Sequence, residues 1–163
     1  MTARQPEPAA IAWLPLSIAC SIAAIVSVYP QAAMVGVGDA YLAEPPAPRS
    51  PVPQLVTVCR LSERRKNVDL VLRALGRLKD AHSFHYTVVG DGEQRAELED
   101  LAAAEGLVGR VTFTGFLDAA ALRHRLAGSD LFVLTAAINP TSHEGFGIAY
   151  LEANACGTPT MAA

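Results

Sequence analysis

From residue 54 onward, short β-branched runs alternate with stretches of helical period, and this alternation limits the fold more than any other feature of the chain. Gln54–Cys59 predicts a buried strand, and Val68–Lys79 predicts a helix with one apolar face. The same pattern predicts further strands at 84–90, 110–115, 130–136 and 158–163, and further helices at 91–106, 118–129 and 144–155. Strands and helices in this order predict an α/β fold, with a parallel sheet covered by helices on both faces.

Composition agrees with one folded domain and argues against nucleic acid as a partner, against a disulfide framework and against a zinc site. The chain has 163 residues, 51% hydrophobic and 18% charged, which is enough apolar material for a core. Its net charge of −3 argues against nucleic acid as a partner, so an anion would need a local basic cluster. Three cysteines without a CxxC pair predict neither a disulfide framework nor a zinc site.

The first 52 residues differ in character from the rest. Residues 8–38 contain no charged side chain, and 9–29 form an apolar run long enough to cross a bilayer. A membrane anchor or signal segment and a buried apolar helix of a larger protein all remain open for this run. The proline-rich stretch 44–53 predicts an extended connector. We therefore expect an apolar segment and linker over 1–52 and a domain over 53–163.

In a parallel sheet, ligands bind where the strands end, so the loops after the strands hold the candidate site. The first of these loops carries four basic residues, Arg60, Arg64, Arg65 and Lys66. The planar guanidinium groups of arginine can each donate two hydrogen bonds to a phosphate, and the lysine ammonium adds a compact positive charge. Together they could neutralise a diphosphate. The alternative is a solvated basic turn paired with Glu63.

The next two loops give weaker signals. The segment GDGEQR has only two glycines of the dinucleotide-binding fingerprint and follows the second strand, which favours a turn and helix cap. After the third strand, Gly115 allows close approach of the backbone, and Phe116 and Leu117 could flank a flat ring. A glycine turn with two packing side chains is the alternative there.

The fourth loop leads into HEGFGIAYLEANACGTP, which holds two glutamates in an otherwise uncharged and largely apolar run. A helix from Glu144 would put Glu152 about two turns later on the same face. Carboxylates accept hydrogen bonds from vicinal sugar hydroxyls, and the free amides of Gly145, Phe146 and Gly147 could bind an anion. Two charges on an amphipathic helix remain the alternative.

This glutamate segment resembles the signature of retaining nucleotide-sugar glycosyltransferases of the GT-B type, the glycosyl transferases group 1. Three other segments agree with that family in order and spacing: VCRLSERRKNVDLVLRAL, VVGDGEQRAEL and VTFTGFLDAAALRHRLAGSDLFVL. The resemblance covers residues 54–163 and implies a Rossmann-like fold, the C-terminal donor-binding half of a GT-B protein. We expect this half to be incomplete at its C-terminus, and an N-terminal domain to be missing from a truncated chain.

The resemblance also implies roles for particular residues. Arg60 and Lys66 would hold the donor diphosphate and stabilise its charge during transfer, and Glu144 would bind the donor sugar. These three are the expected catalytic residues. The mechanism implied is transfer with retention of anomeric configuration, in which the leaving diphosphate helps accept the acceptor's proton. No metal and no cofactor are expected, and the nucleotide-sugar, UDP- or GDP-linked, is a substrate. The acceptor is not indicated.

The remaining expected site residues bind the donor. The backbone of Gly115, Phe116 and Leu117 would face the base, and Glu152 would take the ribose hydroxyls. The amides of Gly145–Gly147 would complete the sugar and phosphate site. The sequence departs from the family at Cys59, where a glycine is usual, and VGVGDAYLAEP shows only a faint similarity to the family's interdomain segment.

Other functions stay open beside this one. A non-catalytic module for nucleotide-sugar binding or for interaction, tethered to a membrane by residues 9–29, would share the same site. An NAD-dependent oxidoreductase rests on GDG alone and lacks the glycine-rich first turn. We expect the protein in the cytoplasm, with membrane association if residues 9–29 insert.

Overall fold

The computed structural model describes residues 37–43, 47–48, 50–136 and 147–162, which belong to one compact unit. The apolar run 9–29 lies outside these residues, as does part of the proline-rich linker, so both expectations stay predictions. The same holds for the domain boundary near residue 52. Within the described residues, no helix is both long and apolar enough to span a membrane.

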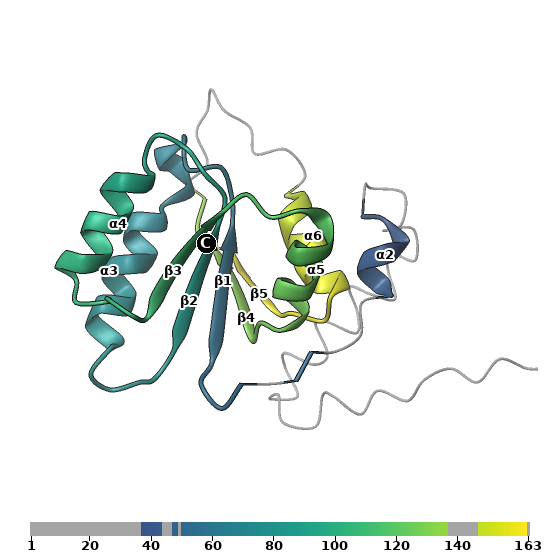
Figure 1. Cartoon of the computed structure of the whole chain (residues 1–163), viewed down its shortest axis with the longest axis horizontal. Helices are drawn as coiled ribbons and strands as arrows, with labels where there is room; N and C mark the ends of the chain where they lie inside the picture. Colours follow the sequence, from purple (N-terminus) through teal and green to yellow (C-terminus); the bar gives the residue numbers. More distant parts are fainter. Residues whose placement is uncertain (1–36, 44–46, 49, 137–146, 163) are drawn as a thin grey trace, which may run out of the picture. The chain divides into compact units, whose positions relative to one another are not determined.

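The predicted parallel sheet is confirmed. Its five strands are β1 (Gln54–Val58), β2 (His85–Val89), β3 (Val111–Gly115), β4 (Leu131–Leu134) and β5 (Thr160–Ala162). They lie in the order β3-β2-β1-β4-β5, and every neighbouring pair is parallel (Figure 1). The order reverses between β1 and β4, as it does in Rossmann-like sheets.

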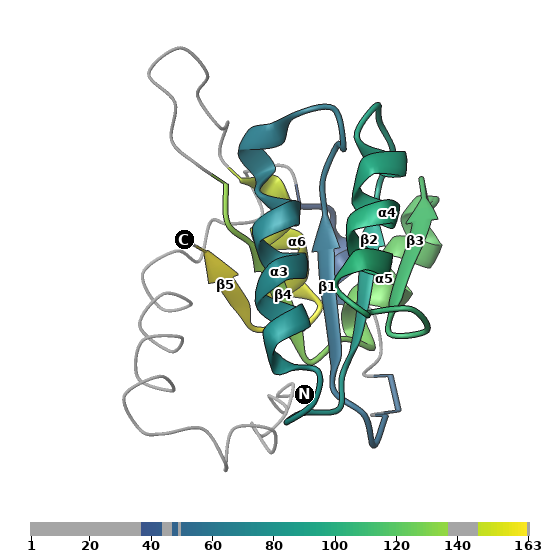
Figure 2. The ribbon, with the colours of Figure 1, turned by 90° about the vertical axis from the view of Figure 1, so that its left-hand side faces the viewer.

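Helices cover both faces of this sheet. They are α2 (Asp39–Leu42), α3 (Val68–Leu78), α4 (Arg95–Ala104), α5 (Ala119–Ala127) and α6 (Ile148–Ala155), with a 3-10 turn η2 (Arg64–Lys66) before α3. The pair α3 and α4 covers one face, which is in front in Figure 2, and the pair α5 and α6 covers the other. The helix α2 packs beside α6, and the sequence pattern did not predict it.

Each face of the sheet has its own apolar core. On the first face, Leu72 and Leu75 of α3 and Leu98 of α4 pack against Val88. On the second face, Leu126 and Ala153 pack against Val56 and Phe132. Consecutive residues of β2 and β4 are buried because helices cover both faces, which explains the continuous apolar runs in the sequence.

Helix α5 begins with a side-chain cap. The carboxylate of Asp118 accepts a hydrogen bond from the backbone N–H of Ala121 at 2.8 Å. We expect Asp118→Ala to lower the free energy of unfolding by about 1 kcal/mol, because that amide loses its partner. Asp118→Asn keeps an accepting oxygen and should change little. Urea unfolding followed by circular dichroism measures both, and equal losses in the two variants would contradict the capping role.

Candidate functional site

The reversal of strand order between β1 and β4 brings two of the predicted loops together. The loop after β1 holds Arg60 and Lys66, and the segment between β4 and α6 ends at Gly147. Their neighbourhood follows from the parallel pairing of β1 with β4, in which Leu55 lies opposite Leu131. In open α/β sheets this crevice is the usual position of a ligand.

Asn67 ties these two loops to each other. Its side-chain amide donates a hydrogen bond to the carbonyl oxygen of Thr135, just after β4, at 2.5 Å. Its backbone is in the left-handed region at φ 51° and ψ 33°, where it precedes α3. Asparagine enters this region more easily than most residues. The basic loop is therefore held at a fixed place beside the β4 end.

The four basic residues of the loop divide into two pairs. Arg64 turns toward α4 and makes a two-pronged ion pair with Glu97, at 2.7 and 3.0 Å. The Nε of Arg65 pairs with Glu63 at 2.5 Å, so the alternative of a basic turn paired with Glu63 holds for this residue. These contacts turn both arginines toward structural partners.

The other two basic residues are those expected to bind phosphate. Arg60 is exposed and lines a hollow at the ends of the strands. Lys66 closes the turn η2 and is only 8% exposed. A cation excluded from water interacts more strongly with an anion than an exposed one does.

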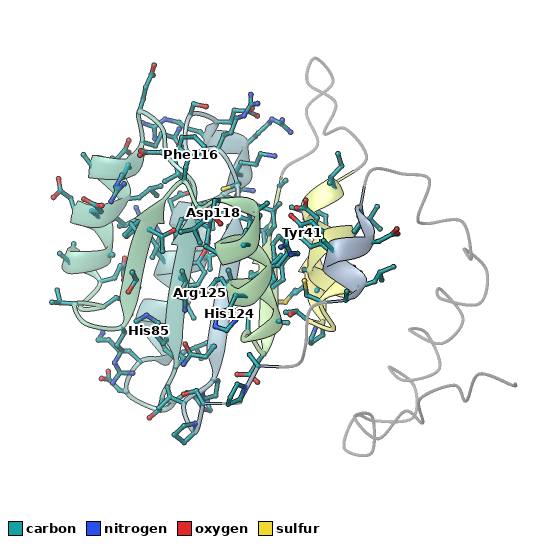
Figure 3. All side chains as sticks on the ribbon, turned by 45° about the vertical axis from the view of Figure 1, so that its right-hand side comes forward. Tyr41, His85, Phe116, Asp118, His124 and Arg125 are labelled. Atoms are coloured by element: carbon teal, nitrogen blue, oxygen red, sulfur yellow. The ribbon has the colours of Figure 1, made fainter. Side chains whose placement is uncertain are left out.

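The hollow beside Arg60 has a volume of about 250 Å³ and is mostly apolar. The ends of β1 and β2 and the loop after β3 form it, with Val58, Cys59, Arg60, Val89, Gly90, Phe116, Leu117 and Leu122 as its lining. Phe116, 77% exposed, lies at the carboxyl edge of the sheet (Figure 3). A larger hollow of about 680 Å³ lies between α3 and α4. Most of its lining belongs to α3 and α4, and only Arg64, Asn67 and Gln94 come from the loops after β1 and β2, so we assign no site to it.

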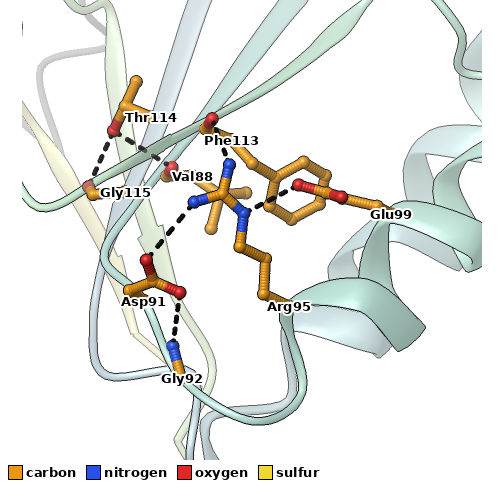
Figure 4. Close-up of polar contacts among 8 residues, drawn as sticks. All are labelled: Val88, Asp91, Gly92, Arg95, Glu99, Phe113, Thr114 and Gly115. Atoms are coloured by element: carbon orange, nitrogen blue, oxygen red, sulfur yellow. Dashed lines mark hydrogen bonds and ion pairs between the residues drawn. The ribbon is translucent and has the colours of Figure 1, made fainter.

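The GDG segment has a structural role in this fold. Arg95 bonds Glu99 at 2.8 Å and the carbonyl oxygen of Phe113 at 3.2 Å, and lies 3.4 Å from Asp91 (Figure 4). Asp91 accepts a hydrogen bond from the N–H of Gly92 at 2.8 Å, which supports the interpretation as a turn. The expectation that this aspartate caps the following helix is wrong, because α4 starts later, after Gln94, without a side-chain cap.

The helix expected from Glu144 begins four residues later. Gly147 is in the left-handed region at φ 65° and ends the preceding loop, and α6 starts at Ile148. The predicted start of this helix at Glu144 is therefore corrected to Ile148, and the placement of both glutamates on one face stays a prediction. Glu144, Gly145 and Phe146 lie outside the described residues, so their expected roles stay predictions.

Glu152 lies on α6, half-buried, and has a partner that the sequence did not suggest. Burial raises the pKa of Tyr41, on α2, to about 12, and its interaction with Glu152 adds to this shift. The only hint in the sequence was the faint similarity of VGVGDAYLAEP to an interdomain segment.

The comparison with known families decides the identity of the fold. The model of the glycosyl transferases group 1 matches residues 42–163, which is more than half of the chain. The chain belongs to this glycosyltransferase family. The match includes Leu42 of α2, so the family's region starts before the first strand.

Several glycosyltransferases are similar to this chain. The GDP-mannose-dependent alpha-(1-6)-phosphatidylinositol dimannoside mannosyltransferase of Mycobacterium tuberculosis is 37% identical over 113 residues, 69% of this chain and 28% of that protein. The lipopolysaccharide outer core galactosyltransferase WaaB superposes with a TM-score of 0.61 and 25% identity, over 72% of this chain and 32% of that one. The pneumococcal O-GlcNAc transferase GtfA, solved with UDP and GlcNAc, shares the fold at a TM-score of 0.59 and 21% identity. The superposition covers 70% of this chain and 21% of that one.

These similarities support the Rossmann-like half of a GT-B glycosyltransferase fold. The chain spans less than a third of the length of these curated relatives. In the described part of the glycosyltransferase domain, no group of three or more histidine, cysteine or acidic side chains is arranged to bind a metal.

Proposed function

We propose that this chain is the donor-binding part of a retaining glycosyltransferase that uses a nucleotide-sugar. The observation that carries the proposal is the Asn67–Thr135 hydrogen bond, which holds the basic loop of β1 against the end of β4. A diphosphate bound between these loops would meet Arg60 and Lys66 on one side and the start of α6 on the other. The N-terminus of a helix favours an anion.

The two ends of the donor have separate places in this proposal. The base would lie in the apolar hollow beside Phe116 and Leu117. Gly115 precedes them, and its carbonyl oxygen accepts a hydrogen bond from Gly90 of the same hollow. The ribose would reach Glu152 of α6. The donor sugar would lie near Gly147, with Glu144, Gly145 and Phe146, whose roles rest on the resemblance of the sequence.

Catalysis in this arrangement needs no protein nucleophile. The bond between the anomeric carbon and the diphosphate oxygen breaks, and the acceptor oxygen forms the new bond on the same face of the sugar. The acceptor's proton passes to the leaving diphosphate. Arg60 and Lys66 would stabilise the negative charge that develops on this leaving group.

The choice of nucleotide is also part of the proposal. The mannosyltransferase relative is described as GDP-mannose-dependent, and the O-GlcNAc transferase that shares the fold was solved with UDP. We therefore propose UDP- or GDP-sugars as donors, with no cofactor. An assay of sugar transfer by the complete gene product, with a panel of nucleotide-sugar donors, would distinguish an enzyme from a binding module.

Calorimetry with UDP, GDP and ADP tests the binding site directly. We expect at least one of them to bind the purified chain, and Glu152→Ala to weaken that binding about 10- to 100-fold, because a charged acceptor of ribose hydroxyls is lost. The 2′,3′-dideoxy nucleotide should bind the variant and the parent equally. Asp100→Ala, which removes an exposed carboxylate from the middle of α4, is the matched control. No heat with any nucleotide at millimolar concentration would refute a working site.

A further inference from the structure

Arg95, the first residue of α4, lies where the ends of β2 and β3 meet. Its guanidinium reaches three acceptors from different parts of the chain (Figure 4). Nε donates to Glu99 on the same helix at 2.8 Å, and Nη1 lies 3.4 Å from the carboxylate of Asp91. Nη2 donates to the carbonyl oxygen of Phe113 at 3.2 Å. The arginine therefore connects α4 with the turn after β2 and with the end of β3.

The end of β3 is irregular at this point. The pairing of β2 with β3 shifts register, so that Phe113 and Gly115 lie opposite consecutive residues of β2. Thr114 is the extra residue of this bulge, and a bulge locally disrupts the hydrogen bonds of the ladder. Arg95 donates to the carbonyl oxygen one residue before the bulge. The side chain thus supports the strand where its own pairing is interrupted.

The guanidinium of Arg95 also lies against Gly115, the last residue of β3. A Cβ added to Gly115 would lie 3.3 Å from Nη1 of Arg95 and 3.7 Å from the carboxylate of Asp91. The carbonyl oxygen of Gly115 accepts a hydrogen bond from the N–H of Gly90 at 2.9 Å. The residue that leads into the loop after β3 is therefore held by α4 and by the end of β2.

Asp91 extends this support to the loop after β1. Its carbonyl oxygen accepts a hydrogen bond from the N–H of Leu61 at 2.9 Å, and its carboxylate accepts one from the N–H of Gly92 at 2.8 Å. The carbonyl oxygen of Leu61 accepts a further bond at 2.9 Å from the N–H of Gln94, just before Arg95. The start of α4 is therefore tied to the loops that follow β1, β2 and β3.

The apolar hollow is formed by the ends of these same three strands. Its lining includes Arg60 after β1, Gly90 after β2, and Phe116 and Leu117 after β3. Arg95 does not line the hollow, so it acts on a ligand there only through the residues that do. Phe116 is exposed, so the backbone of its loop, more than packing of its ring, determines where it lies. The contacts of Arg95 fix that backbone.

We propose that Arg95 is a positioning residue that holds the loop Gly115–Leu117 in the conformation that binds the base of the donor nucleotide. The inference rests on the proposed function, in which the base lies in the apolar hollow. A wall that is ordered before the ligand arrives binds it more tightly, because less conformational entropy is lost on binding. Arg95 therefore affects binding of the base and not binding of the diphosphate, which lies beside Arg60 and Lys66.

The test compares a nucleoside diphosphate with ribose 5-diphosphate, the same ligand without its base. Calorimetry on the full chain would use the tightest-binding of UDP, GDP and ADP, and the ratio of the two affinities is the preference for the base. Arg95→Met keeps a long unbranched side chain and loses all three polar contacts. We expect this variant to bind the nucleoside diphosphate about fivefold more weakly, the effect of ordering one side chain during binding. Its affinity for ribose 5-diphosphate should be unchanged.

Glu99→Gln is the matched control within the same network. It weakens the exposed ion pair of Arg95 on α4 and leaves the acceptors of Asp91 and Phe113 in place, so its preference should equal the parent's. Arg95→Lys is the milder second variant. It keeps the charge but lacks the planar guanidinium and cannot reach three acceptors at once, so its preference should also fall. In a Phe116→Ala background, Arg95→Met should have little further effect.

The possible results separate this inference from the proposed function. If the parent prefers the nucleotide and both Arg95 variants keep that preference, the role of Arg95 is wrong and the proposed site stands. A merely structural role weakens both ligands together and gives this result. An equal fall in Glu99→Gln would attribute the effect to charge and would also overturn the inference.

Two results in the parent protein are decisive as well. If it binds ribose 5-diphosphate as tightly as the nucleotide, the hollow does not bind the base, and the inference is wrong while the diphosphate site stands. If it binds neither ligand, both the inference and the proposed function are wrong. A lower preference in Arg95→Met and Arg95→Lys, with Glu99→Gln unchanged, supports both.

Discussion

Replacing Lys66 with methionine should weaken the binding of nucleoside diphosphates by about 10- to 100-fold, the range for losing a hydrogen bond from a charged group. Methionine keeps a long apolar stem, so the packing of this buried side chain is largely retained. The backbone is already fixed, because the N–H of Lys66 donates to the carbonyl oxygen of Glu63 at 3.0 Å and Asn67 bonds the end of β4. The variant thus removes a charge and leaves the loop in place.

Pyrophosphate separates the role of Lys66 from that of Glu152. If the lysine binds the diphosphate, Lys66→Met weakens the binding of inorganic pyrophosphate and of the nucleoside diphosphate by similar factors. Glu152→Ala should weaken only the binding of the nucleotide, because pyrophosphate has no ribose. Competition calorimetry at low ionic strength, where charge contributes most, measures both affinities.

Arg64→Ala is the control for Lys66→Met. Arg64 lies on the same short turn, but its guanidinium faces α4 and pairs with Glu97. Its loss should leave both affinities unchanged. If Lys66→Met melts at the parent's temperature and binds as tightly, the phosphate-binding role of Lys66 is wrong. An equal loss in Arg64→Ala would mean a general electrostatic effect.

The strands and helices could be predicted from the sequence because each buries apolar residues with a regular period. The helix expected at Val68–Lys79 is α3, Val68–Leu78, and the strand expected at Gln54–Cys59 is β1, Gln54–Val58. Helices cover both faces of the sheet, so the central strands β1, β2 and β4 had to be largely apolar, and the spacing left little choice of topology. Local pattern and tertiary packing agree in this part of the chain.

The start of α6 could not be predicted in the same way. The run from Glu144 to Ala155 has a composition that suits a helix, but Gly147 takes a left-handed conformation, and a side chain added there would lie 2.8 Å from the ring of Tyr150. A glycine inside an apolar run signals a helix boundary only when its conformation is known. The position of Glu152 was still predicted correctly as helical.

The partners of charged groups were the least predictable part of the site. Four basic residues in one loop look equivalent in the sequence, yet Arg64 and Arg65 pair with Glu97 and Glu63. The packing of α2 on α6 likewise joins residues about a hundred positions apart, through a helix of four residues. No local period marks such contacts, because they depend on how separate elements pack.

Replacing Gly90 with alanine should lower the free energy of unfolding by about 3 kcal/mol or more, through backbone strain and overpacking together. Gly90 has φ 131°, and a Cβ there would lie 1.9 Å from the carbonyl oxygen of Cys59. Its N–H also bonds the carbonyl oxygen of Gly115 at 2.9 Å. Three strand ends meet at this residue, so the backbone has little freedom to move away.

Gly109 provides the matched control. It also has a positive φ, 77°, but no atom lies within 4 Å of an added Cβ. Gly109→Ala should therefore cost only the conformational strain, about 1 kcal/mol. Thermal unfolding followed by circular dichroism compares the two, and Gly90→Ala should melt about 10 °C below the parent, well below Gly109→Ala. Equal melting temperatures would show that the contact with Cys59 does not determine the requirement for glycine.

The same pair of variants decides what the GDG segment is for. In a dinucleotide-binding turn, glycine gives a phosphate access to the backbone, so its loss would affect binding more than folding. In this fold, Gly90 allows the backbone after β1 to approach β2 closely. The loss of stability in Gly90→Ala should therefore appear without any ligand. Gly90→Ala with an unchanged melting temperature and abolished nucleotide binding would reverse that assignment. A lower melting temperature in the ligand-free protein identifies the segment as the support that holds Cys59 and Arg60 at the edge of the hollow.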